Sequence, residues 1–406
     1  MKIIALNCTY SSGGAKVMLD IASVAIFNNY EYYVFTPSIN PDSPDYCLSY
    51  SSSIEHKINI KIGQILGYDN AFLKFGTLNL IRKIKKMKPD VIHIHGIHNW
   101  SVDYKILFRF LEKTNIKIVW TQHDCWSFTG KCPYYISAKC NKWVTGCYSC
   151  PQLLEYPKSN YFDNSKFMYN YKKKCFTNLS NLTIVTVSKW LSQEVHKSYL
   201  NKYKIEVIQN AIDYNKYKNT SSDLRQVFNL QNNFIILCVA SGWSRRKGFE
   251  DVINLAKELR KFPNNCKIVI IGVSKLQMET CLKNGILGLQ RTDDISSIVN
   301  WYSTADVFFN PSLEETFGLV TAEAMACGTP IIVYNSTASP ELIEDTDNFC
   351  VEPHDIKKII KCINEIRIKG KDTYKVKNIS RVINSFNKYT QYEKYLKLYD
   401  RIVINN

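Results

Sequence analysis

The 406-residue sequence contains no apolar run of 18 residues, so it predicts no membrane-spanning helix. It has only 16 Gly and 12 Pro, and it shows no low-complexity segment or fixed-period repeat. These absences exclude collagen-like, disordered and solenoid architectures. The first residues also lack the charged start, apolar middle and small-residue cleavage site of a signal peptide. We therefore expect a globular cytoplasmic protein, and its length predicts two or three domains.

Acidic residues are in short supply. The chain has 36 Asp and Glu against 52 Lys and Arg, a net charge of +16, of which about +12 lies in residues 1–210. This excess predicts an anionic partner, such as nucleic acid, a phosphorylated metabolite or an acidic lipid surface, and its asymmetry suggests two units with different partners. The cationic runs at 82–88 and 172–174 fit either solvated helix faces or a binding patch.

Short β-branched runs alternate with amphipathic helical stretches along the whole chain. This pattern predicts an α/β fold of parallel sheets covered on both faces. A polar stretch at 214–233 precedes the restart of the pattern, so we expect one domain over residues 1–208 and a second over 209–385. A terminal helix at 386–406 should pack back on the first domain. The expected strands are 2–7, 32–36, 91–95, 117–122, 183–187, 205–209, 234–240, 267–272, 307–310 and 330–334.

The most specific segment runs from Pro311 to Pro330 and predicts a strand end, a loop with Gly318 and a helix from about Leu319. Backbone N–H groups and the positive dipole end at such a helix start bind phosphate readily. Glu315 and Glu323 are eight residues apart, so they would share a helix face if the helix extended back to Glu315. One carboxylate would then lie at the phosphate end, and the deeper one could accept both hydroxyls of a ribose. The alternative is a merely solvated helix start.

Two other turns carry anion-binding features. Arg245, Arg246 and Lys247 follow the first strand of the second half, where three consecutive cations favour an anion such as diphosphate, unless they simply form an exposed turn. Gly13 and Gly14 open the first helix and form a weaker phosphate-ready turn.

Histidines follow two predicted strands of the first half, at 93, 95 and 98 and at 123. Such positions lie where α/β proteins build their clefts. The spacing supplies no carboxylate or cysteine partner, and we therefore do not expect a metal among these histidines.

Together these segments resemble the family-four retaining glycosyltransferases of GT-B fold. The resemblance rests on Glu315-x7-Glu323 within 311–330, on Arg246-Lys247-Gly248, on Gly13-Gly14, and on the segments 121–124 and 210–213, in the expected order. It implies two Rossmann-like parallel-sheet domains that face a central cleft, with the C-terminal helix crossing back. Domain 1–208 would bind the acceptor and domain 209–385 the nucleotide-sugar donor.

The resemblance also implies residue roles. Glu323 would hold the nucleotide ribose and Glu315 the donor sugar, and His123 would lie beside the transferred sugar. The diphosphate would be bound by Arg246, Lys247 and the N–H groups of Gly318, Leu319 and Gly14. Many relatives carry an Arg where this chain has Gly242-Trp243, and we choose Arg246 over Arg245 because it adjoins Lys247.

Fixed cations and a helix N-terminus stabilise the charge of a departing diphosphate without a divalent metal. We therefore expect a metal-independent enzyme that uses a UDP- or GDP-sugar. Asp345-Thr346-Asp347 matches the metal-binding Asp-x-Asp of other glycosyltransferases, but we interpret it as a chance match in an acidic loop. Retention of configuration is implied by the resemblance alone.

A cysteine cluster remains outside these roles. Cys132, Cys140, Cys147 and Cys150 lie within 19 residues and end in Cys-x2-Cys. They are compatible with a structural zinc site, with reduced packing cysteines or with disulfides. The aromatic residues of this loop either wall an acceptor site or form a small core of their own.

We expect the product to belong to bacterial surface polysaccharide, such as O-antigen, capsule or exopolysaccharide. The basic first half suits a lipid-linked glycan acceptor at the anionic inner face of the plasma membrane, where the enzyme would be peripheral. The alternatives are a GT-B-shaped sugar-nucleotide epimerase or phosphorylase and a basic nucleic-acid-binding protein. We do not expect nucleic acid as a partner, because it leaves Glu-x7-Glu unexplained.

Overall fold

The computed structural model describes residues 1–261, 265–292 and 294–404. By its internal contacts the chain divides into two compact units, Met1–Gln209 with Tyr389–Asn406 and Asn210–Lys388. We call them unit 1 and unit 2. Among the described residues, no helix combines the length and apolar character that a membrane crossing requires.

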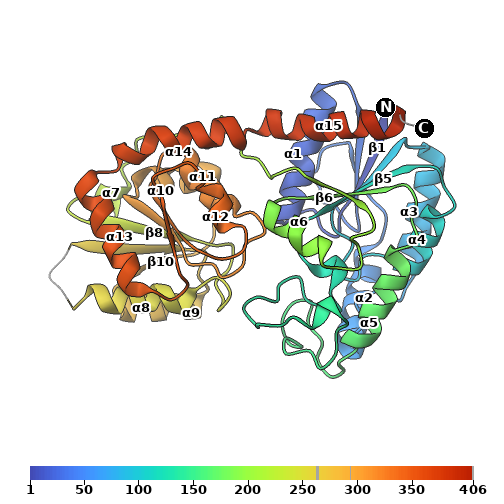
Figure 1. Cartoon of the computed structure of the whole chain (residues 1–406), viewed down its shortest axis with the longest axis horizontal. Coiled ribbons are helices and arrows are strands. Elements are labelled where there is room, and N and C mark those ends of the chain that lie inside the picture. Colours follow the sequence, from blue (N-terminus) through green and yellow to red (C-terminus); the bar gives the residue numbers. More distant parts are fainter. Residues whose placement is uncertain (262–264, 293, 405–406) are drawn as a thin grey trace. The chain divides into compact units, whose positions relative to one another are not determined.

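Unit 1 is built on a seven-stranded sheet in which every strand is parallel to its neighbours, in the order β3-β2-β1-β4-β5-β6-β7. Its central strands are almost fully buried, as near-continuous apolar runs covered by helices require (Figure 1). The strands are β1 (Lys2–Leu6), β2 (Glu31–Thr36), β3 (Cys47–Ser49), β4 (Val91–Ile94), β5 (Lys117–Gln122), β6 (Leu182–Thr186) and β7 (Lys204–Val207).

The helices of unit 1 connect these strands and are mostly capped by side chains, as when Ser12 accepts from the Ala15 N–H at the start of α1. They are α1 (Gly13–Phe27), α2 (Ser53–Leu66), α3 (Phe75–Met87), α4 (Tyr104–Leu111), α5 (Ser165–Phe176), α6 (Lys189–His196) and the terminal α15 (Lys388–Ile404). Between β5 and α5 the long connection contains only the short 3-10 turns η1 (Trp126–Phe128) and η2 (Lys142–Val144).

Unit 2 contains a second all-parallel sheet of six strands, in the order β10-β9-β8-β11-β12-β13. Its strands are β8 (Phe234–Val239), β9 (Cys266–Ile271), β10 (Leu287–Leu289), β11 (Val307–Asn310), β12 (Ile331–Tyr334) and β13 (Phe349–Val351). Its helices are α7 (Leu224–Val227), α8 (Phe249–Leu259), α9 (Lys275–Lys283), α10 (Ile295–Thr304), α11 (Leu319–Ala326), α12 (Ser339–Leu342), α13 (Ile356–Lys369) and α14 (Asp372–Ser385). Two parallel sheets confirm the expected α/β class.

The terminal helix α15 joins a polar network in the core of unit 1. The Tyr399 hydroxyl lies 2.6 Å from His93 Nδ1, and the Tyr395 hydroxyl lies 3.1 Å from Thr121 Oγ1. His93 Nε2 is in turn 2.8 Å from the same threonine oxygen. The ring of His95 packs against that of His93 with the centroids 3.9 Å apart and the planes tilted by 40°. The last helix is therefore tied to β4 and β5 by buried hydrogen bonds.

Burial keeps these histidines uncharged. It lowers the pKa of both His93 and His95 well below the ordinary value, and neighbouring histidines add to the effect. In the unfolded chain the same groups bind protons below about pH 6.5. The unfolded state therefore takes up more protons than the folded state when the pH falls, and stability rises with pH until about 6.5.

We predict that acidification from about pH 6.5 to pH 5 weakens unit 1 by up to about 1.4 kcal/mol per pH unit for each histidine whose pKa burial lowers. Hydrogen exchange of peptides from β4 and β5, corrected for the intrinsic rate, should show the loss. A His95→Gln variant should reduce the slope by about 1.4 kcal/mol per pH unit, and peptides from β8 and β9 serve as the control. Equal protection of β4 and β5 at both pH values would contradict the prediction.

Candidate functional site

Two loops of unit 2 that follow neighbouring strands are joined to each other. The loop after β8 holds Arg246, whose carbonyl accepts from the Leu313 N–H at 2.8 Å and whose Nη1 donates to the Glu314 carbonyl at 3.0 Å. Because β8 and β11 pair in parallel, their carboxyl ends lie at one edge of the sheet. The expected cationic turn and the Glu-x7-Glu segment thus form one site.

Lys247 and Glu315 form an ion pair at this site. Lys247 Nζ lies 2.5 Å from Glu315 Oε1, and the two side chains are 17% and 12% exposed. Burial lowers the pKa of Lys247, and the Glu315 carboxylate opposes that shift. Burial also works to raise the pKa of Glu315, but Lys247 and Arg246 hold it below its ordinary value. The pair is therefore ionised at neutral pH and remains partly open to solvent.

The structure corrects one expectation about Glu315. Helix α11 begins at Leu319, after Gly318 with φ +98°, so Glu315 lies in the loop and not on a helix face shared with Glu323. The loop is fixed at this point, because the Glu315 N–H donates to Thr337 Oγ1 at 2.9 Å. Leu319 is the first residue of the helix, where N–H groups have no partner within the helix. The predicted phosphate-binding helix start is thus present, with Glu315 beside it.

Glu323 lies one turn into α11, is buried, and accepts a hydrogen bond of 3.0 Å from the Tyr302 hydroxyl of α10. Burial and the nearby carboxylate raise the pKa of Tyr302 well above its ordinary value, so its hydroxyl keeps the proton that it donates. A carboxylate accepts several hydrogen bonds, so hydroxyl groups such as those of a ribose are chemically suitable donors to it.

Gly248 explains why the cationic turn lies so close to β11. Its φ is +77°, and a Cβ at this position would stand 2.2 Å from the Pro311 carbonyl oxygen. Trp243 is buried, and its indole N–H donates to the Ile271 carbonyl at 2.8 Å, so it belongs to the core. Arg245 is exposed, whereas Arg246 is half-buried and bonded to the neighbouring loop. These positions favour Arg246 as the anion-binding arginine.

In unit 1 the structure brings Gly14 and His123 together. A Cβ on Gly14 would stand 3.1 Å from His123 Cδ2, so the absence of a side chain lets the start of α1 approach the ring. His123 Nε2 is 3.0 Å from His95 Nδ1, and only one of these two nitrogens carries a proton in that bond. Burial lowers the pKa of His123 to about 4, with Asp124 opposing and His98 reinforcing the shift. His123 is therefore a neutral hydrogen-bonding group.

A neighbouring cluster was not visible in the sequence. Cys8 Sγ lies 3.0 Å from His98 Nδ1, and His98 Nε2 lies 3.5 Å from Asp124 Oδ2. Burial would lower the pKa of His98, but Cys8 and Asp124 raise it well above the ordinary value. The three residues follow β1, β4 and β5, so only the pairing of these strands assembles them. The sequence spacing around His98 offered no such partners.

The four cysteines Cys132, Cys140, Cys147 and Cys150 all line one cavity of about 20 Å³ in the connection after β5. As the side chains stand, no three His, Cys, Asp or Glu residues of the described ranges are grouped closely enough to hold a metal ion. The structure therefore does not by itself support the zinc interpretation. All four cysteines are free thiols, so it shows no disulfide among them.

The aromatic residues of this connection form a small core. Phe128, Tyr135 and Trp143 are buried. The ring centroid of Trp143 lies 5.1 Å from that of Phe128 and 5.0 Å from that of Tyr135. Trp126 is also buried, whereas Tyr148 is 54% exposed. Phe128, Tyr135 and Trp143 therefore form a core of their own, whereas Trp126 packs against Tyr104 and Phe176.

The two carboxylates of Asp345-Thr346-Asp347 face α14. Asp347 pairs with Lys377 at 2.8 Å, and Asp345, whose side chain is 90% exposed, lies 3.8 Å from Arg381.

The expected site residues thus form two groups, each described within its own unit. Unit 2 holds Arg246, Lys247, Glu315, Gly318, Leu319 and Glu323 on the loops after β8 and β11 and on α11. Unit 1 holds Gly14 and His123 on the segments after β1 and β5.

Comparisons with known proteins show the family of the chain. Residues 11–216 match the model of Glycosyltransferase Family 4, and residues 233–367 match that of Glycosyl transferases group 1. The putative colanic acid biosynthesis glycosyl transferase WcaC of Escherichia coli K12 is 24% identical over 380 residues, which cover 89% of this chain and 90% of that protein. The capsular polysaccharide biosynthesis glycosyltransferase CapM of Staphylococcus aureus is 27% identical over 236 residues, 53% of this chain and 61% of CapM.

Solved structures show the same fold. Sucrose-phosphate synthase of Thermosynechococcus elongatus aligns over 100% of both chains with a TM-score of 0.71 and 16% identity. Anabaena Alr3699/HepE in complex with UDP-glucose aligns over 99% of this chain and 100% of that chain, with a TM-score of 0.67 and 16% identity. With its two Rossmann-like parallel-sheet domains the chain has the GT-B fold, and it belongs to glycosyltransferase family 4.

Proposed function

We propose that this glycosyltransferase transfers a hexose or N-acetylhexosamine from a UDP- or GDP-sugar to a hydroxyl of a glycan acceptor, with retention of configuration. The observation that carries the donor assignment is the Lys247–Glu315 ion pair beside the start of α11, with Arg246 on the same loop. Two cations and a helix N-terminus form a site for a diphosphate, and the carboxylates suit sugar hydroxyls. UDP-glucose bound to HepE, a protein of the same fold, supports a uridine donor.

Each residue has a distinct role in this proposal. Arg246 and Lys247 bind the diphosphate together with the N–H groups of Gly318 and Leu319, and Gly14 lies at a second anion-binding helix start, in unit 1. Glu323 accepts hydrogen bonds from the ribose hydroxyls, because its buried carboxylate is already oriented by Tyr302. Glu315 orients the donor sugar and holds Lys247 in place. Neutral His123 donates or accepts a hydrogen bond at the sugar without adding charge.

The chemical step follows from these charges. The bond between the anomeric carbon and the diphosphate oxygen breaks, so negative charge grows on the leaving group and positive charge on the sugar carbon. Arg246, Lys247 and the α11 start stabilise the leaving group without reorganising. The acceptor oxygen forms the new bond on the face from which the diphosphate departs, and its proton passes to that diphosphate. Glu315 is not a double-displacement nucleophile in this scheme.

The acceptor in this proposal is a lipid-linked glycan of a bacterial surface polysaccharide such as O-antigen, capsule or exopolysaccharide. The named roles of WcaC in colanic acid and CapM in capsular polysaccharide biosynthesis support this class of product. Unit 1 binds the acceptor and unit 2 the donor in this assignment. The larger positive charge of residues 1–210 suits an acceptor held at an anionic cytoplasmic membrane surface.

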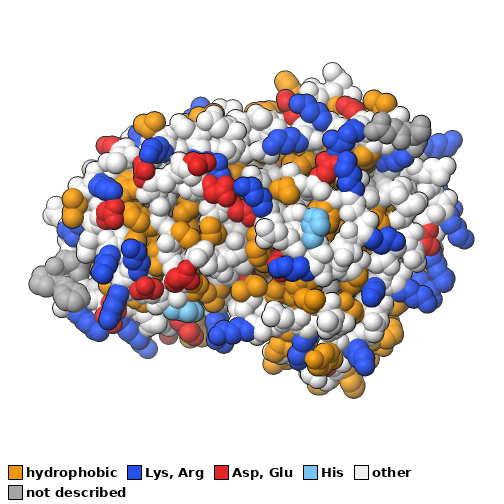
Figure 2. All heavy atoms as spheres, in the orientation of Figure 1, with side chains coloured by type: hydrophobic (Ala, Val, Ile, Leu, Met, Phe, Trp, Pro, Cys, Tyr) orange, Lys and Arg blue, Asp and Glu red, His pale blue; other side chains and the backbone are white. Residues whose placement is uncertain are grey.

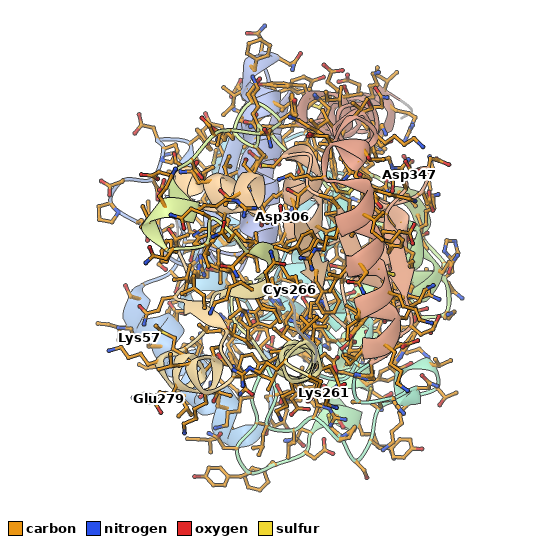
Figure 3. The ribbon with its side chains drawn as sticks, turned by 90° about the vertical axis from the view of Figure 1, so that its left-hand side faces the viewer. Lys57, Lys261, Cys266, Glu279, Asp306 and Asp347 are labelled. Atoms are coloured by element: carbon orange, nitrogen blue, oxygen red, sulfur yellow. The ribbon has the colours of Figure 1, made fainter. Side chains whose placement is uncertain are left out.

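Helix α2 offers a surface for peripheral membrane contact. Ile54, Ile58 and Ile65 are 72%, 39% and 46% exposed, and their spacing places them on one side of the helix. Lys57 and Lys61 are exposed on the same helix, and Figure 3 shows Lys57 at its outer edge. Figure 2 shows basic side chains dispersed over the visible face and not gathered in a single patch. Apolar anchors flanked by lysines are typical of helices that lie in a membrane interface.

One prediction of the proposed function concerns donor binding. Glu323→Ala should weaken UDP or GDP binding about 10- to 100-fold, because it removes a charged hydrogen bond to the ribose. Glu323→Gln, which keeps the shape and the contact with Tyr302, should show a smaller loss. Glu279→Ala on the outside of α9 is the matched control (Figure 3). Isothermal titration calorimetry measures all three, and an unchanged affinity for Glu323→Ala would contradict the donor assignment.

A second prediction concerns the reaction. In metal-depleted buffer, addition of Mg²⁺ or Mn²⁺ should leave the transfer rate unchanged, since Arg246 and Lys247 already neutralise the diphosphate. Nuclear magnetic resonance of the product should show the anomeric configuration of the donor. A metal-dependent rate would refute the first part, and an inverted product would refute retention.

A third prediction concerns the membrane. Binding to phosphatidylcholine vesicles should rise with added phosphatidylglycerol and fall with salt, because each lysine near the surface contributes about 1 kcal/mol. Ile54→Ser with Ile58→Ser should weaken co-sedimentation. Ile368→Ser, which changes an 86% exposed isoleucine of α13, is the control. Co-sedimentation that responds to neither lipid charge nor salt would dispose of the proposal.

A further inference from the structure

The four-cysteine cavity in the connection after β5 is not used by the proposed transfer reaction. Cys132, Cys140, Cys147 and Cys150 come from a stretch of 19 residues with little regular secondary structure, yet all of them line the same cavity of about 20 Å³. A volume of this size accommodates about one water molecule. Many structural zinc sites likewise consist of four cysteines around one metal ion.

The backbone around these thiols is arranged to stabilise negative sulfur. The Gly130 N–H donates to Cys147 Sγ at 3.1 Å, and the Gln152 N–H donates to Cys150. Between Cys147 and Cys150 the chain makes a tight turn, in which Ser149 adopts φ +43°. Lys142 Nζ donates to the carbonyls of Tyr148 and Ser149 at 3.1 Å and 2.9 Å. Burial raises the pKa of Cys147 and Cys150, and these N–H groups oppose that shift, so the sulfurs are thiols without a metal and have N–H partners ready for the thiolates that a metal would stabilise.

Two buried lysines lie beside the same thiols. Lys131 lines the cavity and gives its ammonium hydrogens to the Gln152 and Glu155 carbonyls at 3.1 Å and 2.6 Å. Lys172 is fully buried and donates to the Trp126 carbonyl at 2.8 Å, and its charge acts on Cys132 and Cys147. Asp69 acts on both lysines, Glu155 acts on Lys131 and Asp124 acts on Lys172. The cavity cysteines act on the same lysines, Cys150 and Cys132 on Lys131 and Cys147 and Cys132 on Lys172, so thiolates formed at the cavity would interact with two buried lysines.

We propose that Cys132, Cys140, Cys147 and Cys150 bind one structural Zn²⁺ as a tetrathiolate. Such a centre carries a net charge of −2, which complements Lys131 and Lys172. Binding releases the four thiol protons to solvent, and all four coordination positions are then filled by protein. The site therefore orders the connection between β5 and α5 and does no chemistry of its own.

The thiols must close on the metal. Zn–S bonds of about 2.3 Å place tetrahedral sulfurs about 3.8 Å apart, a tighter grouping than the side chains adopt in this structure. The four cysteines lie outside helices and strands, so rotations of their side chains and small shifts of irregular backbone suffice. The aromatic core of Phe128, Tyr135 and Trp143 beside them stays in place.

The test is the zinc content of the full chain, purified without chelator and measured by mass spectrometry of the metal. We expect about one zinc per chain, released when the thiols are titrated with an organomercurial. Cys150→Ser should lose the metal, whereas Cys350→Ser, which changes an exposed cysteine of unit 2, should keep it. If Cys150→Ser fails to fold, cobalt substitution of the unaltered chain should give the visible spectrum of a tetrahedral tetrathiolate.

Three outcomes would overturn the proposal. One is a folded, zinc-free chain with 14 titratable thiols, which would make these cysteines packing residues. Another is a zinc-free chain with four thiols fewer, which would indicate two disulfides. The third is zinc that persists in a folded Cys150→Ser variant. Because these readouts measure metal and thiols, they are independent of whether the proposed donor and acceptor are correct.

Discussion

In both sheets every strand runs parallel to its neighbours, so the loops that follow the strands emerge along one edge of each sheet. This constraint places Arg246 beside Glu314 and Lys247 beside Glu315, although 68 residues separate the two members of each pair in the chain. It also places Gly14 beside His123. The polar groups of the site need no long loop to meet, because backbone hydrogen bonds inside the sheets already hold their starting points.

The ion pair at the unit 2 site illustrates how such an edge is kept ready for an anion. Lys247 left alone at a half-buried position would lose part of its charge, because burial disfavours the ammonium ion. Glu315 opposes that loss of charge. The loop that carries Glu315 is held in turn by Thr337, so the carboxylate keeps its place. An anionic ligand that binds Lys247 would take the place of the Glu315 carboxylate as the negative partner of the lysine. Its binding would therefore leave no buried lysine charge without a partner.

The sequence predicted the central strands well because their apolar runs are long and bounded by turn residues. β5 and β11 agree with the expected ranges at both ends. The edge strands β3, β10 and β13 were missed, since three residues carry too little periodicity to stand out. Local motifs also predicted the start of α11 at about Leu319 after a loop with Gly318, and the structure confirms it. Because the helix does not extend back to Glu315, the condition for a helix face shared with Glu323 is not met. The sequence did not reveal the cluster of Cys8, His98 and Asp124, which only tertiary pairing assembles.

The terminal helix gives the chain an order of assembly. Unit 2 occupies residues 210–388, whereas residues 389–406 return to unit 1, so unit 2 is an insertion within unit 1. The two segments that join the units run side by side. The Ile212 N–H donates to the Phe386 carbonyl at 2.8 Å, and the Lys388 N–H donates to the Ile212 carbonyl at 3.1 Å. Unit 1 therefore completes its core only with residues that follow unit 2, because Tyr399 of α15 is bonded to His93 of β4. A chain cut within α15 keeps the whole of unit 2 but leaves unit 1 without this buried partner.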